Sequence, residues 1–324
     1  PMGLADYSAF ILGGLPKQGQ TLEEVKDLLL NEIKKLRAGE FDEKMLQANI
    51  NNFKLYELQS MESNEGRADI FVNSFINGTN WKDEVTAIDR MAKLTKEDIV
   101  AFADKYLKED NYAVVYKKQG KDPNEKKMTK PEITPIVSNR DVASPFLTSI
   151  QENAVRPIEP VFLDFKKDMS QLTAKSDIPV LYKQNTTNDL FQLIYVFDMG
   201  NNNDKALGTA FDYLEYLGTS DMTPEELKSE FYRLACTFYV SPGNERTYVV
   251  LSGLNENMPA AMQLFEKLLA DAQVNKEAYN NLVGDILKAR ADAKLNQGQN
   301  FSRLMNYAMY GPKSPATNLL TEAE

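Results

Sequence analysis

The chain of 324 residues is 43% hydrophobic, which is ample for a buried core, and its length suggests two domains of ordinary size. Its 47 acidic and 37 basic residues give a net charge of -10, which argues against a nucleic-acid partner because phosphates bind basic surfaces. The chain has no histidine, so these residues perform no histidine-dependent chemistry, and no apolar run approaches the roughly 20 residues of a membrane span.

The single cysteine, Cys236, lies in the apolar run at residues 234–238. A lone cysteine forms no intrachain disulfide, so a reducing compartment and a cysteine-poor envelope protein fit the composition equally well. Because no histidine is present to activate it, Cys236 is predicted to be a small buried hydrophobic residue and not a nucleophile.

Both ends of the sequence suggest a piece of a longer protein. The chain begins at Pro1 and soon enters an apolar stretch at residues 10–12. At the other end, Thr321 and Glu324 have the spacing of a helix-start capping box with no helix after it. We therefore expect the native chain ends to lie outside this sequence.

Residues 1–118 have the pattern of a strand, several helices and a closing strand. Thr21 and Glu24 predict a capping box, and Gly39 stands where a left-handed helix end is expected. The apolar spacing predicts further helices after Asp42, over residues 67–76 and 81–91, and after a cap at Thr95. The flanking strands are predicted at residues 7–12 and 112–116.

Residues 119–176 are rich in lysine and proline and show little periodicity. Proline blocks helix interiors and central strands, so this stretch is predicted to be a long extended linker that wraps over a surface. The six prolines of the stretch are Pro123, Pro131, Pro135, Pro145, Pro157 and Pro160.

Residues 177–324 open with predicted strands and continue with helices. Thr223 and Pro224 form a helix-start pattern, with threonine as cap and proline in the first turn. The strands are predicted at 178–182 and 190–198, with a hairpin formed by 237–240 and 247–251. The remaining helices are predicted at 205–217, 256–272 and 276–295.

Strands and longer helices are thus mixed without the regular alternation of a doubly wound sheet. This pattern predicts an α+β fold with two subdomains, each a mainly antiparallel or mixed sheet with helices packed on one face. The expected divisions are residues 1–118, a linker at 119–176, and residues 177–324.

Two segments of the first part resemble one known family. Gly39-Glu40-Phe41 leads into a long helix, and Leu94-Thr95-Lys96-Glu97-Asp98-Ile99 precedes the strand at Tyr112. Together they resemble the second half of a repeat in the insulinase, pitrilysin and mitochondrial-processing-peptidase family of inverzincin zinc metallopeptidases. The resemblance implies that residues 1–118 are the second half of a first peptidase-like repeat.

A sharper resemblance lies in the second part. Phe197-Asp198-Met199-Gly200 and the later FDYLEYLGT at 211–219 resemble the strand, glycine and metal-binding helix that open a repeat of this family. In active members that helix supplies the H-x-x-E-H motif, with a Gly-Thr pair shortly after it. The matching positions here are Asp212, Glu215 and Tyr216, so the resemblance implies a catalytically degenerate second repeat.

The spacing matters because ligands about one helical turn apart share a face, while the glutamate between them takes a proton from metal-bound water. Tyr216 is a poor replacement for histidine, since a phenol must first lose a proton with a pKa near 10. The family's third ligand is a later glutamate, for which Glu277 and Asp285 are the candidates. A plain apolar helix face formed by Phe211, Leu214 and Leu217 explains the same segment without any metal.

Tyr307 and Tyr310, followed by Gly311-Pro312, are similar to an aromatic, glycine-containing segment of the family. They are candidates for substrate binding along a chamber wall, and packing in the core or in a turn is the alternative. No catalytic residue and no metal ligand is expected in this chain.

The resemblance implies that the chain is a non-catalytic portion of a bacterial zinc-dependent peptidase. It would form scaffold and substrate-chamber wall, with no cofactor of its own and zinc in a part of the parent protein before Pro1. The expected substrates of the parent are peptides or unfolded proteins, and the periplasm or cell envelope is favoured over the cytoplasm.

Two alternatives remain. The chain could be a noncatalytic binding or assembly partner that forms a homo- or heterodimer with a peptidase subunit. In the second alternative, Asp212 and Glu215 belong to a metal site of a different type.

Overall fold

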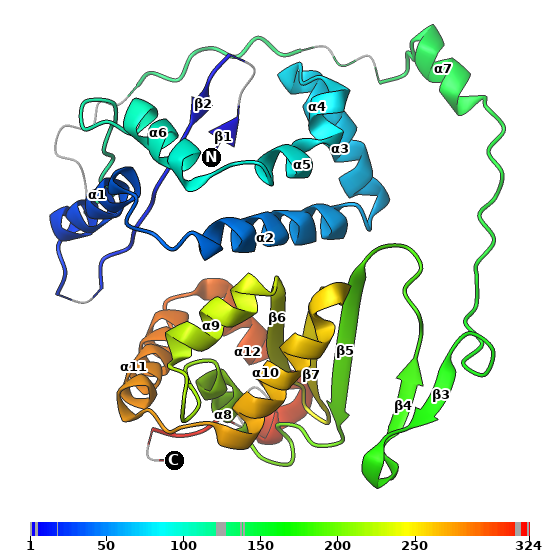
Figure 1. The fold of residues 1–324 in the computed structure, drawn as a ribbon. Helices are drawn as coiled ribbons and strands as arrows, with labels where there is room; N and C mark the ends of the chain where they lie inside the picture. The colour runs from blue at the N-terminus through cyan, green and yellow to red at the C-terminus, as the bar shows by residue number, and fades with distance from the viewer. Residues whose placement is uncertain are drawn as a thin grey trace. The chain divides into compact units, whose positions relative to one another are not determined.

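The chain divides into two compact units, residues 1–112 together with 185–324, and residues 113–184. The computed structural model, drawn in Figure 1, describes residues 2–3, 6–17, 19–120, 128–136, 138, 140–314, 319–322 and 324. The predicted linker proline Pro123 and the terminal Pro1 lie outside the described residues.

Two helices of the first segment have the ends that their sequences predict. Helix α1 (Leu22–Ala38) begins at the capping box of Thr21 and Glu24, and it ends at Gly39, whose φ of 70° is left-handed. Helix α6 (Lys96–Tyr106) begins at a second capping box, formed by Thr95 and Asp98. These predictions are confirmed. Such caps can be predicted from the sequence because they depend only on residues three positions apart.

The single helix predicted at residues 81–91 is wrong. The structure has α4 (Trp81–Val85) and α5 (Ala87–Met91) on either side of Thr86. The Thr86 hydroxyl donates a hydrogen bond of 2.7 Å to the carbonyl of Lys82, a back-bond of the kind that bends helices. Helices α2 (Lys44–Ser60) and α3 (Asn64–Asn77) lie where the apolar spacing predicts them.

The strands predicted for the first segment are largely unpaired. Among its described residues, only the short strands β1 (Met2–Gly3) and β2 (Ser8–Ala9) pair, and they are antiparallel. Residues 112–116 have no regular secondary structure, and within the described part of the chain no strand pairs with them to form a hydrogen-bonded ladder. A sheet covering the first segment, and with it the predicted arrangement of two sheet-bearing subdomains, is therefore not shown.

Residues 113–184 contain two regular features that the proline pattern did not predict. Helix α7 (Pro145–Gln151) starts with Ser144 as its cap and Pro145 at its first position, where proline needs no N–H partner. The strand β3 (Ser170–Thr173) pairs antiparallel with the predicted strand β4 (Pro179–Tyr182), and the short 3-10 turn η1 (Lys175–Asp177) joins them. The expectation that prolines exclude helix was wrong at α7, because a first-turn proline is compatible with a helix.

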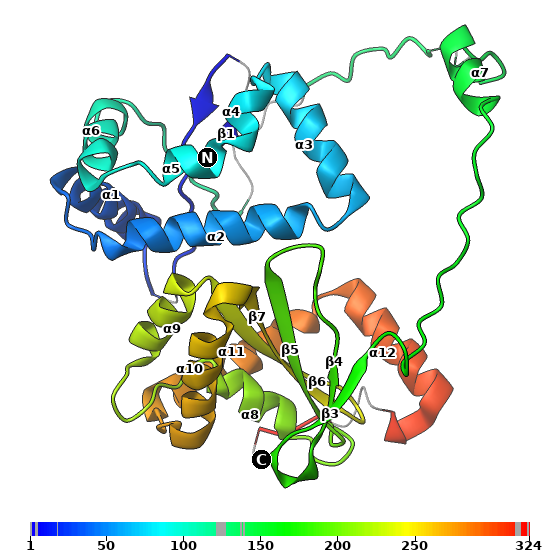
Figure 2. The same cartoon turned by 45° about the vertical axis from the view of Figure 1, so that its right-hand side comes forward.

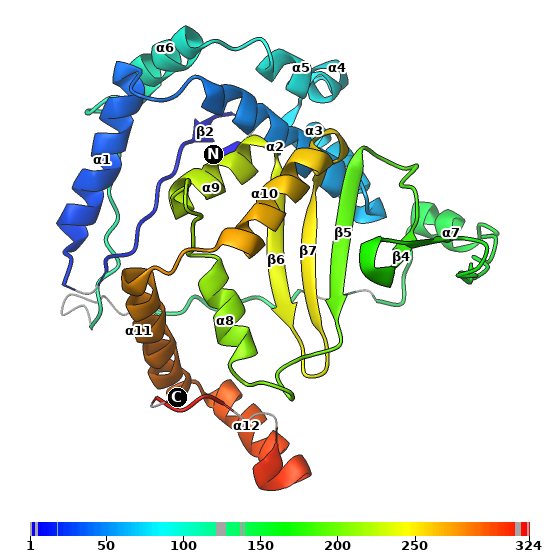
Figure 3. The same cartoon turned by 60° about the horizontal axis from the view of Figure 1, so that its bottom comes forward.

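A three-stranded antiparallel sheet organises residues 185–324. Its strands β5 (Leu190–Phe197), β6 (Cys236–Pro242) and β7 (Thr247–Leu254) lie in the order β5-β7-β6. Helices α8 (Leu207–Leu214), α9 (Pro224–Arg233) and α10 (Met258–Asp271) lie to one side of the strands (Figures 2 and 3). The predicted hairpin and the α+β class are confirmed for this part of the chain.

The core lies between this sheet and helices α9 and α10. Residues that share a face of the three strands, such as the cross-strand set Leu193, Leu251 and Phe238, pack against Phe265 of α10. Phe265 and Leu251 are both fully buried. Helix α11 (Lys276–Ala293) was predicted, whereas α12 (Gln297–Tyr310) was not; the short turns η2 (Asn255–Asn257) and η3 (Gly311–Lys313) complete the segment.

Candidate functional site

The helix that carries the motif positions is shorter than predicted. Helix α8 ends at Leu214, so Glu215 is its C-terminal cap and Tyr216 lies beyond it. Asp212 and Glu215 are exposed, and Tyr216 is 43% exposed with the ammonium of Lys228 5.3 Å from its ring centroid. Tyr216 is therefore placed for a cation–π contact with a lysine.

The structure does not bring the candidate metal ligands together. Glu277 and Asp285 both lie on α11, exposed like Asp212 and Glu215. Among the residues that the structure describes, no three His, Cys, Asp or Glu side chains are grouped closely enough to hold a metal ion. A tetrahedral zinc site needs three or four such ligands, so these four carboxylates do not form one in this arrangement.

The glycine that precedes the motif helix is held against a hairpin tip. The amides of Asn201 and Asn202 donate to the carbonyls of Gly243 and Asn244, each at 2.9 Å. A Cβ added to Gly200 would lie 2.5 Å from the Gly243 carbonyl oxygen, so only glycine fits at this position. The loop after β5 is thus joined to the β6–β7 turn by backbone hydrogen bonds.

The second glycine-containing element of the motif, the pair Gly218-Thr219, is also held by backbone contacts. The amide of Thr219 donates to the Met222 carbonyl at 2.9 Å, and the amide of Gln273 donates to the Gly218 carbonyl at 3.0 Å. A Cβ on Gly218 would lie 2.2 Å from the Met222 oxygen. The pair therefore closes a tight turn that leads into the capping box of Thr223 and Glu226 at the start of α9.

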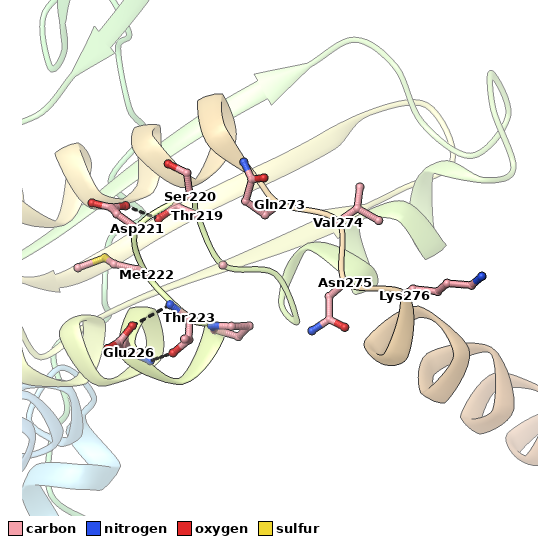
Figure 4. Close-up of a pocket in the computed structure, with 12 residues that line it drawn as sticks. Thr219, Ser220, Asp221, Met222, Thr223, Glu226, Gln273, Val274, Asn275 and Lys276 are labelled. Atoms are coloured by element: carbon pink, nitrogen blue, oxygen red, sulfur yellow. Dashed lines mark hydrogen bonds between the residues drawn. The ribbon is translucent and has the colours of Figure 1, made fainter.

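An open pocket of about 540 Å³ lies between this turn and the segment that joins α10 to α11. Figure 4 shows Thr219 to Thr223 on one side of the pocket and Gln273 to Lys276 on the other. Tyr213 of α8 fastens the second side, because its hydroxyl donates to the Asn275 carbonyl at 2.7 Å and accepts from the Asn275 amide at 2.9 Å. The rings of Tyr213 and Tyr279 form a T-shaped pair, with an interplanar angle of 82° and centroids 5.8 Å apart.

Two aspartates of this region are held as carboxylates. The Lys267 ammonium and the Thr219 hydroxyl both hydrogen-bond to Asp221 and lower the pKa of its carboxyl group. The hydroxyl and the amide of Ser220 donate to one oxygen of Asp271 at 2.6 and 2.9 Å, and these bonds lower the pKa of Asp271. These carboxylates accept hydrogen bonds that join the turn at residues 219–221 to helix α10, which makes them structural groups.

Replacing Asp271 with asparagine is expected to make the stability of the chain less sensitive to acid. Because the pKa of Asp271 is below its ordinary 3.8 in the folded state, its stabilising effect is complete above that value and is lost as the pH falls through the lower folded pKa. Melting temperatures measured from neutral to strongly acid pH should differ between the two proteins near neutrality and converge in acid. The control is Asp292→Asn, at the exposed pair of Asp292 with Lys288. The role of Asp271 would be contradicted if the difference in melting temperature between Asp271→Asn and the wild type did not change with pH. It would also be contradicted if that difference were no larger than the one that Asp292→Asn causes.

The two aromatic candidates for substrate binding lie on α12. Tyr307 is 51% exposed and Tyr310 is 62% exposed, so neither is packed in a core. Phe301 and Leu304 on the same helix are similarly exposed, at 62% and 64%. The structure therefore presents a run of aromatic and apolar side chains along α12 and does not place the two tyrosines in the pocket beside Gly218.

Cys236 is buried at the start of β6, as the sequence predicts. Burial raises the pKa of its thiol to about 11, so the thiol stays protonated at neutral pH. This environment is that of a structural cysteine.

None of the helices in the described part of the chain combines the length and the apolar character that a membrane span requires. No protein-family model matches the chain, and no curated protein matches its sequence.

Several solved structures are similar to the chain at low sequence identity. A protease from Helicobacter pylori is 12% identical with a TM-score of 0.34, covering 38% of this chain and 30% of that one. An M16 peptidase inactive domain from Pseudomonas fluorescens is 17% identical with a TM-score of 0.42, covering 48% of this chain and 38% of that one. The periplasmic protease PqqL from Escherichia coli is 14% identical with a TM-score of 0.42, covering 93% of this chain and 36% of that one. The chain thus spans between 30% and 38% of the length of these three chains.

Proposed function

We propose that this chain is a non-catalytic portion of a zinc-dependent metallopeptidase, in which it forms scaffold and substrate-chamber wall for peptide proteolysis by the parent protein. One observation carries the proposal. The motif keeps its two glycines, Gly200 and Gly218, in positions that only glycine can occupy, while its metal-binding positions hold Asp212, Glu215 and Tyr216. A framework that is retained without its ligands is what a degenerate repeat is expected to look like.

The chemistry of the three positions supports a noncatalytic role. A neutral imidazole binds Zn²⁺ at pH 7, whereas a phenol must be deprotonated first, and Tyr216 lies past the end of α8 beside a lysine. Glu215 is the position that would accept a proton from metal-bound water, and among the described residues it belongs to no group of three His, Cys, Asp or Glu side chains that could hold a metal ion.

The proposal predicts that the purified chain cleaves no peptide and carries no stoichiometric zinc. The measurement is the hydrolysis of an unfolded polypeptide with added zinc, together with metal analysis of the dialysed protein. Turnover that a chelator abolishes and zinc restores would overturn the assignment.

Metal content also tests the alternative in which Asp212 and Glu215 belong to a metal site of a different type. If Asp212 were a ligand of such a site, Asp212→Ala would lose metal while the control Asp292→Ala, at a lysine-paired surface position, would keep it. Equal metal content in the two variants is the outcome expected here.

The second candidate function is that of a noncatalytic assembly partner of a peptidase subunit, and the exposed aromatic residues of α12 favour it. The complete gene product discriminates between the two, because an intact H-x-x-E-H motif in it supports the first function and its absence supports the second. A location in the bacterial periplasm or envelope belongs to the same proposal and is tested by cell fractionation.

A further inference from the structure

Helix α9 ends in a set of backbone carbonyls that receive side-chain amides from elsewhere in the chain. The last turn of any helix leaves carbonyl groups without partners inside the helix. At the end of α9, Asn52 donates at 2.7 Å to the Tyr232 carbonyl, which also accepts the Ala235 amide at 3.0 Å, and Asn51 donates to the Arg233 carbonyl at 3.3 Å. Asn257 donates to the next carbonyl, that of Leu234, at 2.7 Å. Two of these three asparagines belong to α2, about 180 positions away in the sequence.

The backbone at this helix end is fixed, so the carbonyls are held in place. Ala235, which follows α9, has a φ of 47° and is fully buried, and its carbonyl lies close to Gly253 of the central strand. The chain passes directly from Ala235 into β6. The carbonyl-lined end of α9 is therefore a rigid, preformed acceptor surface.

Helix α2 presents a matching stripe. Ala48, Asn51, Asn52, Leu55 and Leu58 recur at the spacing of one helix face. The two asparagines donate hydrogen bonds to the carbonyls at the end of α9. Leu55 and Leu58 pack against the buried cluster of Leu190, Ala235 and Leu254.

Further contacts lie at the margins of this stripe. The Tyr232 hydroxyl donates to Asn49 at 2.5 Å, Lys54 pairs with Glu256 at 3.4 Å, and Asn188 donates to Glu62 at 3.0 Å. A side-chain amide donates to a carbonyl oxygen without bringing a charge, so asparagine is a suitable partner for such a surface.

We propose that the carbonyl-lined end of α9 is a docking site for the asparagine-bearing helix α2, and that this joint holds residues 1–112 to residues 185–324 without help from the connecting residues 113–184. The connecting residues then act only as a tether, which raises the local concentration of the two parts. This inference does not depend on the proposed function.

The test uses the full chain with a protease site inserted in the exposed stretch between Glu132 and Ile133. After cleavage, the two pieces should remain together in size-exclusion chromatography and sedimentation. The dissociation constant is then measured by titration of one labelled piece with the other. Separation of the wild-type pieces upon cleavage would overturn the proposal.

The matched variants locate the interaction. Asn52→Asp replaces a donor by an acceptor that faces the Tyr232 carbonyl, and it is expected to weaken association by at least about tenfold. Tyr232→Phe, which removes one hydrogen bond at the margin, should have a smaller effect. The control is Asn306→Asp on α12. Like that of Asn52, the Asn306 side chain donates to the carbonyl four residues back. Among the described residues, Asn306 has no hydrogen bond to a distant part of the chain.

Circular dichroism before cleavage checks that each variant keeps its helices. If Asn52→Asp loses helix, Asn52→Ala provides the same test without a new charge. An unchanged dissociation constant in the folded Asn52 variant would show that the asparagine does not carry the joint.

Discussion

Replacing Gly253 with alanine is expected to destabilise the chain by about 3 kcal/mol, because the central strand has no room for a methyl group there. A Cβ at Gly253 would lie 2.4 Å from the Ala235 carbonyl oxygen and 2.6 Å from the Cys236 sulfur. Both neighbours are buried, and the register places Gly253 between Phe191 and Cys236 in the middle of the sheet. Neither the backbone of β6 nor that of β5 can move without breaking its ladder. Chemical denaturation followed by circular dichroism measures the loss.

The matched control is Gly284→Ala in helix α11. No atom lies within 4 Å of a Cβ at Gly284, and alanine is favoured over glycine in a helix interior by about 0.8–1.0 kcal/mol. Gly284→Ala should therefore stabilise the chain slightly. A loss below about 1 kcal/mol for Gly253→Ala would contradict the close approach of β6 and β7 at this position.

The features that the sequence predicts correctly depend on neighbours along the chain. Thr21, Thr95 and Thr223 each cap a helix through an acidic residue three positions later, and all three capping boxes form. The β6–β7 hairpin is similarly local, since its strands are joined by a short turn. Such features are set by backbone geometry within one turn of structure.

Two of the features that the sequence did not predict correctly depend on partners far away in the sequence. Residues 112–116 have the composition of a strand, but composition does not supply the neighbouring strand that a ladder needs. The hydrogen bonds of Asn51 and Asn52 to the end of α9 could not be predicted either, because no sequence pattern links an asparagine in a helix to a carbonyl about 180 positions away. The break at Thr86 arises from a side-chain bond that competes with the helix, which a periodic pattern does not register.

The geometry of the candidate site was not predictable from the sequence. The identity of Tyr216, a phenol at a position where the motif has histidine, is enough to predict a poor zinc ligand. The turn at Gly218 is fastened by Ser220 and Asp271, which lie 51 positions apart, and nothing in the sequence pairs them. The early end of α8 at Leu214 was missed because the apolar spacing continues to Leu217.

Replacing Phe265 with alanine is expected to cost about 3–5 kcal/mol, the second large effect that the structure predicts. Phe265 is fully buried, and its ring centroid lies 5.0 Å from that of Phe238 and 6.2 Å from that of Tyr195. It therefore joins α10 to strands on both sides of β7, and alanine would leave a cavity bounded by a sheet that cannot collapse into it. Because whole domains are stable by only about 5–15 kcal/mol, this loss is a large share of the total.

Phe301→Ala on α12 is the matched control, since it deletes the same atoms from a side chain that is 62% exposed. Its cost should stay within about 0.5 kcal/mol, the range for surface substitutions that touch no special feature. Denaturation midpoints of the two variants, compared at equal slope, measure the difference directly. If the two variants lost similar amounts of unfolding free energy, α10 would not cover the core of the sheet. A loss confined to Phe265→Ala would show that the contact between α10 and the three strands stabilises residues 185–324.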